Sequence, residues 1–518
     1  MPPLSTSFKG YIMRTNKCIC LLACLTFSSF SNAVSEKKWI TLGASASHHY
    51  QLENAVKGRS YTQTSNNHQE ADILLMHEEE HENLSHFMHE QYHRCGGFVA
   101  HDSEAEAKAY LSTLEYAHKH QPELTYSIDN PETVQALMGN VSTTGLVNTV
   151  SNMTGFYNRY YTQQSGVDAS NWVKNHWQSL ASSRSDIAVE HYTHTWAQSS
   201  VIVTVPGSEM ADEIVIIGGH LDSINGSNPS SGRAPGADDN ASGIAVLSEV
   251  LKAIVDTNYK PKRTVKIMGF AAEEVGLRGS KAIAQDYKAS GKNVVGMAQF
   301  DMSGHKGGQH DIVFITDYTN SAQNNFMSQL LDKYLPNVSY GFDRCGYGCS
   351  DHASWYQQSF PASFPFESRM RESNRLIHTA NDTEYDAEHS IHFAKLASAY
   401  IAELAKTAGS VTPPPIEPTP IDKTYTDLNV SSGQWWRTSL PLGSGYQELV
   451  VNISGGTGDA DLYVNFGTQS STSQFQCRPY QYGNEEVCTI SFPKSGNWYF
   501  DLRGYTQASG VTLTIKAR

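Results

Sequence analysis

The sequence predicts an α/β fold with a mostly parallel, doubly wound sheet, followed by a small all-β sandwich. Short aliphatic segments such as EIVIIGG, TVKIMGF and VVGMAQF alternate with amphipathic helical segments between about residues 131 and 409. This alternation is typical of parallel sheets covered by helices. A proline-rich linker at 409–423 comes next, and residues 424–518 then alternate with a period of two between Gly, Ser and Asn turns. That pattern indicates a β-sandwich.

Length and charge narrow the class of protein. With 518 residues the chain is too long for one hydrophobic core, so several folded units are expected. It has 52 acidic and 38 basic residues and a formal net charge of −14, which argues against a nucleic-acid partner. No apolar run reaches the roughly 18 residues that span a bilayer, so no transmembrane segment is expected. We expect a monomer.

Residues 1–33 are interpreted as a secretory signal peptide. Arg14 and Lys17 precede the apolar run CICLLACLTFSSF, and the small residues of Ser31-Asn32-Ala33 end it as a cleavage site. An alternative interpretation takes LLAC as a lipoprotein site anchored through Cys24. The secreted form is preferred.

Cysteine usage agrees with export. Cys345 and Cys349 are close in sequence, as are Cys477 and Cys488, and each pair is expected to form a local disulfide in an oxidising compartment. Cys95 is left over. It lies in Arg94-Cys95-Gly96-Gly97, which resembles a cysteine-switch element, although a buried structural cysteine is the more common case.

Residues 34–126 are interpreted as a pro-segment. They are rich in His and Glu, have helical spacing in SEAEAKAYLSTLEYAHKH and carry few strand signals. Two HExxH matches, at 77–81 and 89–93, could indicate a single zinc site. Chance matches are expected in such a composition and neither has an evident third ligand, so a charged helix is the preferred interpretation.

Five segments of the α/β region end apolar runs in metal-ligand side chains. The carboxyl ends of such strands meet at one edge of a sheet, where α/β proteins bind their ligands. Two imidazoles and several carboxylates are enough for two Zn²⁺ ions that share one ligand, an arrangement typical of peptide hydrolysis. The candidate residues are His220, Asp222, Asp238, Asp239, Glu273, Glu274, Asp301 and His378. Asp222 could orient His220, and one of the paired glutamates could act as general base beside the metals.

These motifs resemble the secreted bacterial leucyl aminopeptidases with two co-catalytic zincs. GGHLDS, PGADDNASG, AAEEVGLRGS, FITDY, YGFDRCGYGCSDHASW, PFES and IHTANDT stand in the order of that family. DLYVNFG and CRPYQYGNEEVC are similar to the bacterial pre-peptidase C-terminal domain. The resemblance extends over essentially the whole chain.

The resemblance implies a role for each ligand. Asp238 would be the bridging carboxylate, in an Asp238-Asp239 pair whose peptide bond is cis in the family. His220 and Asp301 would complete one zinc site, and Glu274 and His378 the other. Glu273 would be the general base.

It also implies how substrate is held. Tyr347, in the Cys345–Cys349 loop, would hydrogen-bond the developing oxyanion. An apolar pocket for the first substrate side chain would be formed by Met302, Ile315, Phe364, Phe366 and Ile377. Met370 and Ser373 stand where aromatic residues are frequent in the family, so the strictness of a leucine preference is left open.

The sequence therefore predicts an aminopeptidase that removes N-terminal, preferably large apolar, residues from peptides. The expected units are a signal peptide (1–33), a pro-segment (34–126), a di-zinc catalytic domain (127–408), the linker (409–423) and the sandwich (424–518). Single-zinc glutaminyl cyclisation, carboxypeptidase or deacylase activity, and a non-catalytic interaction module are the alternatives.

Overall fold

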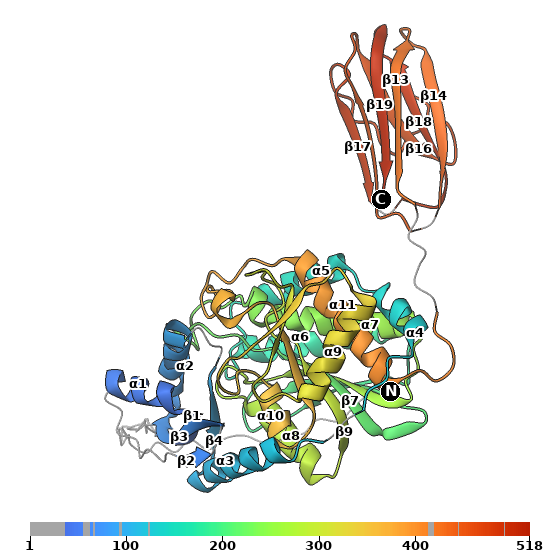
Figure 1. Ribbon diagram of the computed structural model, residues 1–518. Coiled ribbons are helices and arrows are strands. Elements are labelled where there is room, and N and C mark those ends of the chain that lie inside the picture. Colours follow the sequence, from blue (N-terminus) through green and yellow to red (C-terminus); the bar gives the residue numbers. More distant parts are fainter. Residues whose placement is uncertain are drawn as a thin grey trace, which may run out of the picture.

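The computed structural model describes residues 37–54, 63–65, 68–92, 96–122, 125–412, 419–443, 445–491 and 493–518. These residues form an N-terminal domain, a central α/β domain and a C-terminal β-sandwich (Figure 1). The predicted signal peptide with Cys24, and also Cys95, lie outside the described residues. No helix among the described residues is long and apolar enough to cross a membrane.

The N-terminal domain contains a four-stranded antiparallel sheet in the order β2-β3-β1-β4. Its elements are β1 (Lys37–Gly43), α1 (Ala44–Asn54), β2 (Gln63–Ser65), β3 (His68–His77), α2 (Glu78–Tyr92), β4 (Phe98–His101) and α3 (Glu104–Lys119). The expectation of few strands is therefore wrong. Short apolar runs within β1 and β3 bury Ile40, Leu42, Leu74 and Met76 in a small core, although polar residues surround them in the sequence. The charged helix expected for the HExxH region is confirmed as α2.

The central domain has an eight-stranded mixed sheet in the order β11-β10-β12-β9-β7-β8-β6-β5. Its strands are β5 (Ala188–Tyr192), β6 (Ser200–Val205), β7 (Met210–His220), β8 (Arg263–Phe270), β9 (Asn293–Gln299), β10 (Ile312–Ile315), β11 (Tyr340–Asp343) and β12 (Ala362–Phe366). The four central strands, β12, β9, β7 and β8, run parallel. β6 and β5 are antiparallel additions at one edge, and β10 is antiparallel to β12.

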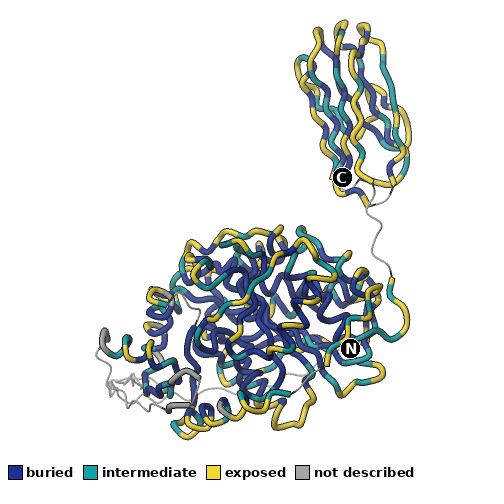
Figure 2. Tube along the Cα trace, viewed as in Figure 1, coloured by how far each residue is buried: buried dark blue, intermediate teal, exposed yellow. Residues whose placement is uncertain are grey.

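Helices cover both faces of this sheet. Val215 and Ile217 of β7 face a large core that includes α4 (Pro131–Met138), α5 (Thr143–Thr154), α6 (Gln164–Leu180), α7 (Gly243–Asp256), α9 (Ser321–Tyr334) and α11 (Ala387–Ala405). Ile214 and Ile216 alternate to the other face, as strand geometry requires. There they pack in a core shared by α8 (Arg278–Ala289), α10 (His352–Gln357) and α3. The N-terminal domain thus supplies one helix to the second layer, and Figure 2 shows how deeply the sheet is buried between the layers.

The C-terminal domain is the expected sandwich. One sheet has the order β13-β19-β15-β17 and the other β14-β18-β16. The strands are β13 (Ile421–Val430), β14 (Trp435–Leu442), β15 (Glu448–Ser454), β16 (Ala460–Phe466), β17 (Glu486–Ser491), β18 (Gly496–Gly504) and β19 (Ala508–Ala517). Leu449, Leu462, Phe500 and Leu513 from the two sheets share one core. Cys477 and Cys488 form a disulfide, as predicted.

Candidate metal centre

The candidate ligands meet at the carboxyl ends of three adjacent parallel strands. His220 is the last residue of β7, Asp301 follows β9, and Glu273 and Glu274 follow β8. His378 arrives from the loop before α11. Because β9, β7 and β8 are neighbours, their ends bring these side chains together, as the sequence predicted.

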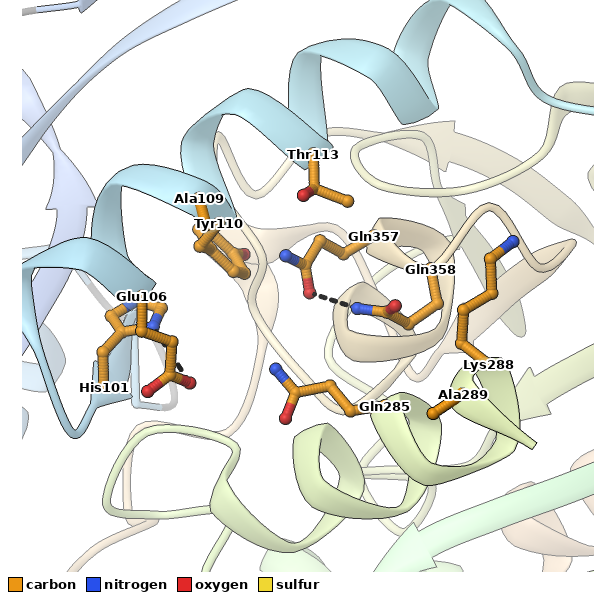
Figure 3. A pocket seen from close by; sticks show the side chains of 10 residues that line it. All are labelled: His101, Glu106, Ala109, Tyr110, Thr113, Gln285, Lys288, Ala289, Gln357 and Gln358. Atoms are coloured by element: carbon orange, nitrogen blue, oxygen red, sulfur yellow. Dashed lines mark hydrogen bonds and ion pairs between the residues drawn. The ribbon is translucent and has the colours of Figure 1, made fainter. Parts of the chain in front are cut away.

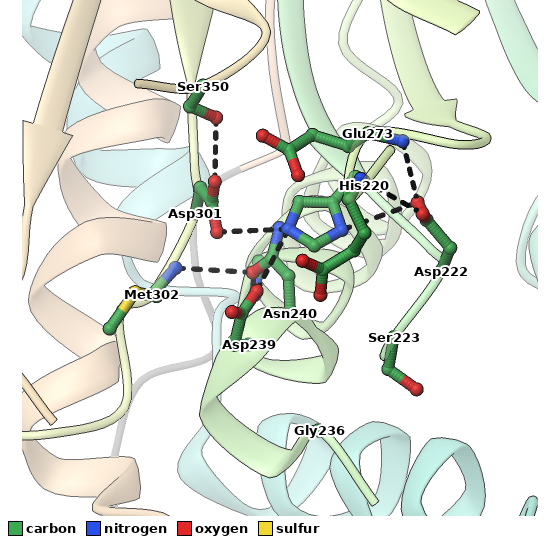
Figure 4. Close-up of polar contacts among 12 residues, drawn as sticks. His220, Asp222, Ser223, Gly236, Asp239, Asn240, Glu273, Asp301, Met302 and Ser350 are labelled. Carbon is green, nitrogen blue, oxygen red and sulfur yellow. Dashed lines mark hydrogen bonds and ion pairs between the residues drawn. The ribbon is translucent and has the colours of Figure 1, made fainter. Parts of the chain in front are cut away.

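Two groups of potential metal ligands form around one shared carboxylate. The first group is His220, Asp239 and Asp301, and the second is Asp239, Glu274 and His378. His220 Nε2 lies 3.0 Å from Asp239 Oδ1 and 3.2 Å from Asp301 Oδ1 (Figure 4). His378 Nε2 lies 3.2 Å from Asp239 Oδ2 and 2.8 Å from Glu274 Oε2. Asp239 therefore presents one oxygen to each group.

The assignment of Asp238 as the shared carboxylate is wrong in this geometry. Asp238 Oδ1 accepts a hydrogen bond from the Gly304 N–H at 2.8 Å, and Oδ2 accepts one from Asn374 Nδ2 at 3.1 Å. The backbone at Asp239 is extended (φ −108°, ψ 92°) within the irregular turn η1 (Ala237–Ser242), so the two adjacent side chains point to different sides. The cis peptide bond is Asp239–Asn240, one residue later than expected.

Two buried aspartates hold the ligand-bearing segments by their backbones. Asp222 Oδ1 and Oδ2 accept from the N–H groups of Glu273 and Glu274 at 3.1 and 3.2 Å. Asp222 Oδ1 also lies 3.5 Å from His220 Nδ1, which agrees with the orienting role predicted for it. In the same way, the carboxylate of Asp382 accepts from the N–H groups of Asp238 and Asp239 at 3.2 and 3.1 Å.

Sequence reasoning missed Asp382 and two further buried groups. Arg159 is fully buried and donates to the carbonyls of Leu221 and Gly236 at 3.0 Å each, which joins the loops after β7. Glu367 accepts from the N–H groups of Asn374 and His305. Asp382 stands in the IHTANDT segment and Glu367 in PFES, so those two motifs held a signal that was available. No motif marks Arg159.

The electrostatics of the protein groups are dominated by crowded buried acids. Burial raises the pKa of Glu273 well above its usual range, and neighbouring carboxylates add to the effect. Burial also raises the pKa of Glu274 to about 7, with Asp239 adding to the rise and His378 opposing it. Burial disfavours protonation of His378, but Glu274 and Asp239 outweigh it and raise its pKa to about 10. A cation beside these buried carboxyl groups would therefore stabilise their charged forms.

The donor set fits divalent cations. Nine carboxyl groups of this region are at most 2% exposed, and the buried groups beside them that can carry a positive charge include His220, His378 and Arg159. The nine carboxyl groups are those of Asp222, Asp238, Asp239, Glu273, Glu274, Asp301, Asp351, Glu367 and Asp382. Buried charge of one sign is costly unless it is neutralised. Imidazole nitrogen and carboxylate oxygen are ligands that Zn²⁺ accepts.

An apolar cluster is formed by the residues predicted to line a substrate pocket. Met302, Ile315, Phe364, Phe366 and Ile377 pack with Tyr347 and with Cys345 and Cys349, and Met370 packs against them. Cys345 and Cys349 form the predicted disulfide. The Ser373 hydroxyl donates to the Met370 carbonyl at 2.9 Å. Met302 directly follows the candidate ligand Asp301, which places this cluster next to the candidate metal centre.

Comparison with known proteins identifies the family. Residues 200–401 match the model of peptidase family M28, and residues 435–504 match the bacterial pre-peptidase C-terminal domain. A probable leucine aminopeptidase of Arthroderma otae is 39% identical over 284 residues, which cover 52% of this chain and 75% of that protein. The chain belongs to peptidase family M28. It is a metallo-exopeptidase.

Solved structures agree with the fold of this M28 peptidase. The LapA aminopeptidase of Legionella pneumophila is 28% identical, with a TM-score of 0.60, over 72% of this chain and 99% of that one. LapB from the same organism is 26% identical, with a TM-score of 0.62, over 71% and 100% of the two chains.

Proposed function

We propose that this protein is a secreted aminopeptidase that uses two zinc ions to remove large apolar residues from the free N-termini of peptides. The geometry of Asp239 is the main support for this proposal. Its two carboxylate oxygens face different imidazoles, and each imidazole has a second carboxylate beside it. His220, Asp239 and Asp301 would hold one ion, and Asp239, Glu274 and His378 the other. Bound there, the ions supply Lewis acidity and lower the pKa of a water molecule.

Glu273 is the proposed general base. Its carboxyl group is fully buried beside the ligands but belongs to neither ligand group. Burial raises its pKa, so the carboxylate readily accepts a proton from the attacking water and can pass it to the leaving amine. The Glu273 backbone N–H donates to Asp222 Oδ1, and this hydrogen bond fixes the position of Glu273.

Tyr347 and the apolar cluster are proposed to bind substrate. Tyr347 belongs to the disulfide-closed loop and packs in the cluster, from which its hydroxyl can donate to the developing oxyanion. Met302, Ile315, Phe364, Phe366 and Ile377 would receive a large apolar side chain. The names of the relatives, leucine aminopeptidases, support this preference.

Secretion and processing form part of the proposal. The two disulfides and the C-terminal domain support an extracellular location. Residues 34–126 would act as a pro-segment, because their domain covers the loop that carries Glu273.

The test compares leucyl p-nitroanilide with its N-acetylated form, using processed protein with and without chelator, and counts zinc per chain. Cleavage of the free substrate alone, two zincs per chain and loss of rate with chelator are expected. Equal cleavage of the blocked substrate would favour a deacylase, and full activity with one zinc would exclude the two-ion site.

A further inference from the structure

The N-terminal domain is attached to the catalytic loop through an edge strand. β4 ends its sheet, so one side of its backbone is unpaired within the domain. The Ala100 N–H donates to the Gly276 carbonyl at 3.2 Å, and Lys281 Nζ of α8 donates to the Ala100 carbonyl. Gly276 follows Glu273 by three residues, and its own N–H donates to the Glu273 carbonyl at 2.9 Å.

Close packing shows that this attachment covers the general base. A Cβ atom on Gly276 would lie 2.8 Å from the Ala100 nitrogen, and one on Gly96 would lie 3.8 Å from Glu273 Oε1. On the other side, His86 of α2 packs on Gly226, whose N–H donates to the His378 carbonyl at 2.9 Å. With the domain in place, none of the six residues assigned as ligands or general base is more than 5% exposed.

We propose that the N-terminal domain is a cap that closes the site at neutral pH, and that protonation of His101, which lies at the contact between β4 and α8, releases it. The closing effect rests on the aminopeptidase proposed above. The proton-dependent attachment rests on the contact between β4 and α8 and does not depend on that function.

The position of His101 requires a neutral ring in the attached state. His101 is buried, its Nε2 lies 3.0 Å from Thr41 Oγ1, and its Nδ1 lies 3.4 Å from Lys281 Nζ. An ammonium group can donate to Nδ1 only when that nitrogen carries a lone pair. Nε2 then carries the hydrogen and donates to Thr41. A proton on Nδ1 would place two cations against each other.

The charged groups around His101 determine whether its protonation is favoured or opposed in the attached state. Lys281 of α8 opposes its protonation, and Arg278 of the same helix adds positive charge near Lys281. Two acids favour protonation of His101: Glu106 of α3, which lies 3.8 Å from Nδ1, and Asp102. Each of them already has a cationic partner. Glu106 is ion-paired with Lys281 at 2.7 Å, and Asp102 is ion-paired with Lys38 of β1 at 2.9 Å. Tyr110 packs against the ring without a charge.

Burial is the largest effect and lowers the pKa of His101 to about 4. A released domain exposes the ring, whose pKa returns toward 6.5, so the released state binds more protons between these values. The contribution of the neutral ring to attachment is therefore fully present above about pH 6.5 and is lost progressively as the pH falls toward 4. At pH 5 the attachment equilibrium falls by at most about 30-fold. Protonation of Glu106 would remove its ion pair with Lys281 at 2.7 Å across the same contact, which acts in the same direction.

Solvent reaches this contact through a hollow of about 310 Å³ between the two domains (Figure 3). His101, Glu106 and Tyr110 line it from the N-terminal domain, and Gln285 and Lys288 from α8. Protons therefore have access to the cluster while the cap is closed.

Hydrogen exchange of the full chain tests the proposal, because the Ala100 amide donates across the contact. Its protection, corrected for intrinsic exchange at pH 7.5 and 5.0, should fall about 10- to 30-fold at the lower pH, while the β1–β3 amides stay protected. His101→Asn, which keeps an acceptor near Nδ1, should remove the pH dependence. His176→Asn, a matched change on α6 at the opposite face of the sheet, should leave it unchanged.

Equal protection at both pH values, the same fall in His101→Asn, or a parallel loss in β1–β3 would overturn the proposal. If His101→Asn does not fold, Lys281→Met provides the second test: it should lower protection at pH 7.5 and reduce the difference between the two pH values. The measurement needs no catalysis, so an inactive protein with pH-dependent protection would contradict only the aminopeptidase proposal.

Discussion

Glu273 and Glu274 are adjacent, equally buried and held by the same aspartate, yet only Glu274 belongs to a ligand group. Glu273→Gln should therefore lower kcat by about 10²- to 10⁴-fold, the usual value of a general base, with the metal content unchanged. Glu274→Gln is the matched control and should lose metal. Rate measurements combined with elemental analysis check both, and metal loss from Glu273→Gln would contradict the division of roles.

Asp238 and Asp239 allow a second comparison of neighbours. Asp239→Asn removes a charge shared by both ligand groups, so zinc affinity should fall by more than the roughly 10- to 100-fold typical of outer partners. The loss of zinc affinity in Asp238→Asn should stay within that range. The oxygens of Asp238 accept hydrogen bonds from the Gly304 N–H and from Asn374 Nδ2 and belong to neither ligand group. Competition with a chelating dye measures both affinities. The reverse order would restore Asp238 as the shared ligand.

At this scale the sequence identified residue types better than it separated neighbours. His220, Glu274 and Asp301 could be predicted because each follows an apolar strand that ends at the same sheet edge. His378 could be predicted because it ends a further apolar segment, although that segment lies in a loop. The choice between Asp238 and Asp239 could not, since it depends on one irregular backbone turn. Arg159 was missed because its role depends on loops about 60 to 80 residues further along the chain.

The start of α7 shows how tightly the elements around the site are fitted. A Cβ atom on Gly243 would lie 2.2 Å from the Phe300 carbonyl, beside Asp301. Gly243→Ala should therefore destabilise the domain by about 1–3 kcal/mol, although alanine favours helices. Gly43→Ala, where no atom lies within 4 Å, is the control. Thermal unfolding measures both, and a stabilised Gly243→Ala would show that the carbonyl moves at little cost.

Elements were predictable where hydrophobic periodicity was clear. The central parallel strands and the sandwich follow their patterns, and the antiparallel additions β5, β6 and β10 turn a mostly parallel sheet into a mixed one. The N-terminal strands were missed because their apolar runs are short and lie among His and Glu residues. Those runs form strands because the sheet encloses a core together with α1 and α2.

For the whole molecule, removal of metal should cost stability as well as activity. Nine buried carboxyl groups repel one another unless cations neutralise them. Zinc at 100 times its dissociation constant should stabilise the native state by about 2.7 kcal/mol for each site, which raises the melting temperature. Scanning calorimetry with zinc and with chelator checks this. Asp239→Asn should show a much smaller difference, and an equal difference would place the metal elsewhere.

The sandwich should unfold independently of the catalytic domain. Its core contains only residues of β13–β19 and of their connections, and its disulfide is internal. A chain that ends at residue 408 should keep its rate on leucyl p-nitroanilide within about twofold and lose one calorimetric transition. A shift in the remaining transition would reveal a stabilising contact between the domains.

The edge position of β4 also makes release of the N-terminal domain irreversible. Once the cap leaves, the Ala100 backbone loses the partners that covered it, and the domain exposes the side of α3 that had completed the helical layer around Trp355. A small domain with an open strand edge and an uncovered apolar face is readily cut by proteases or aggregates. Each cleaved and released cap is thus removed from the equilibrium, and the enzyme opens only once.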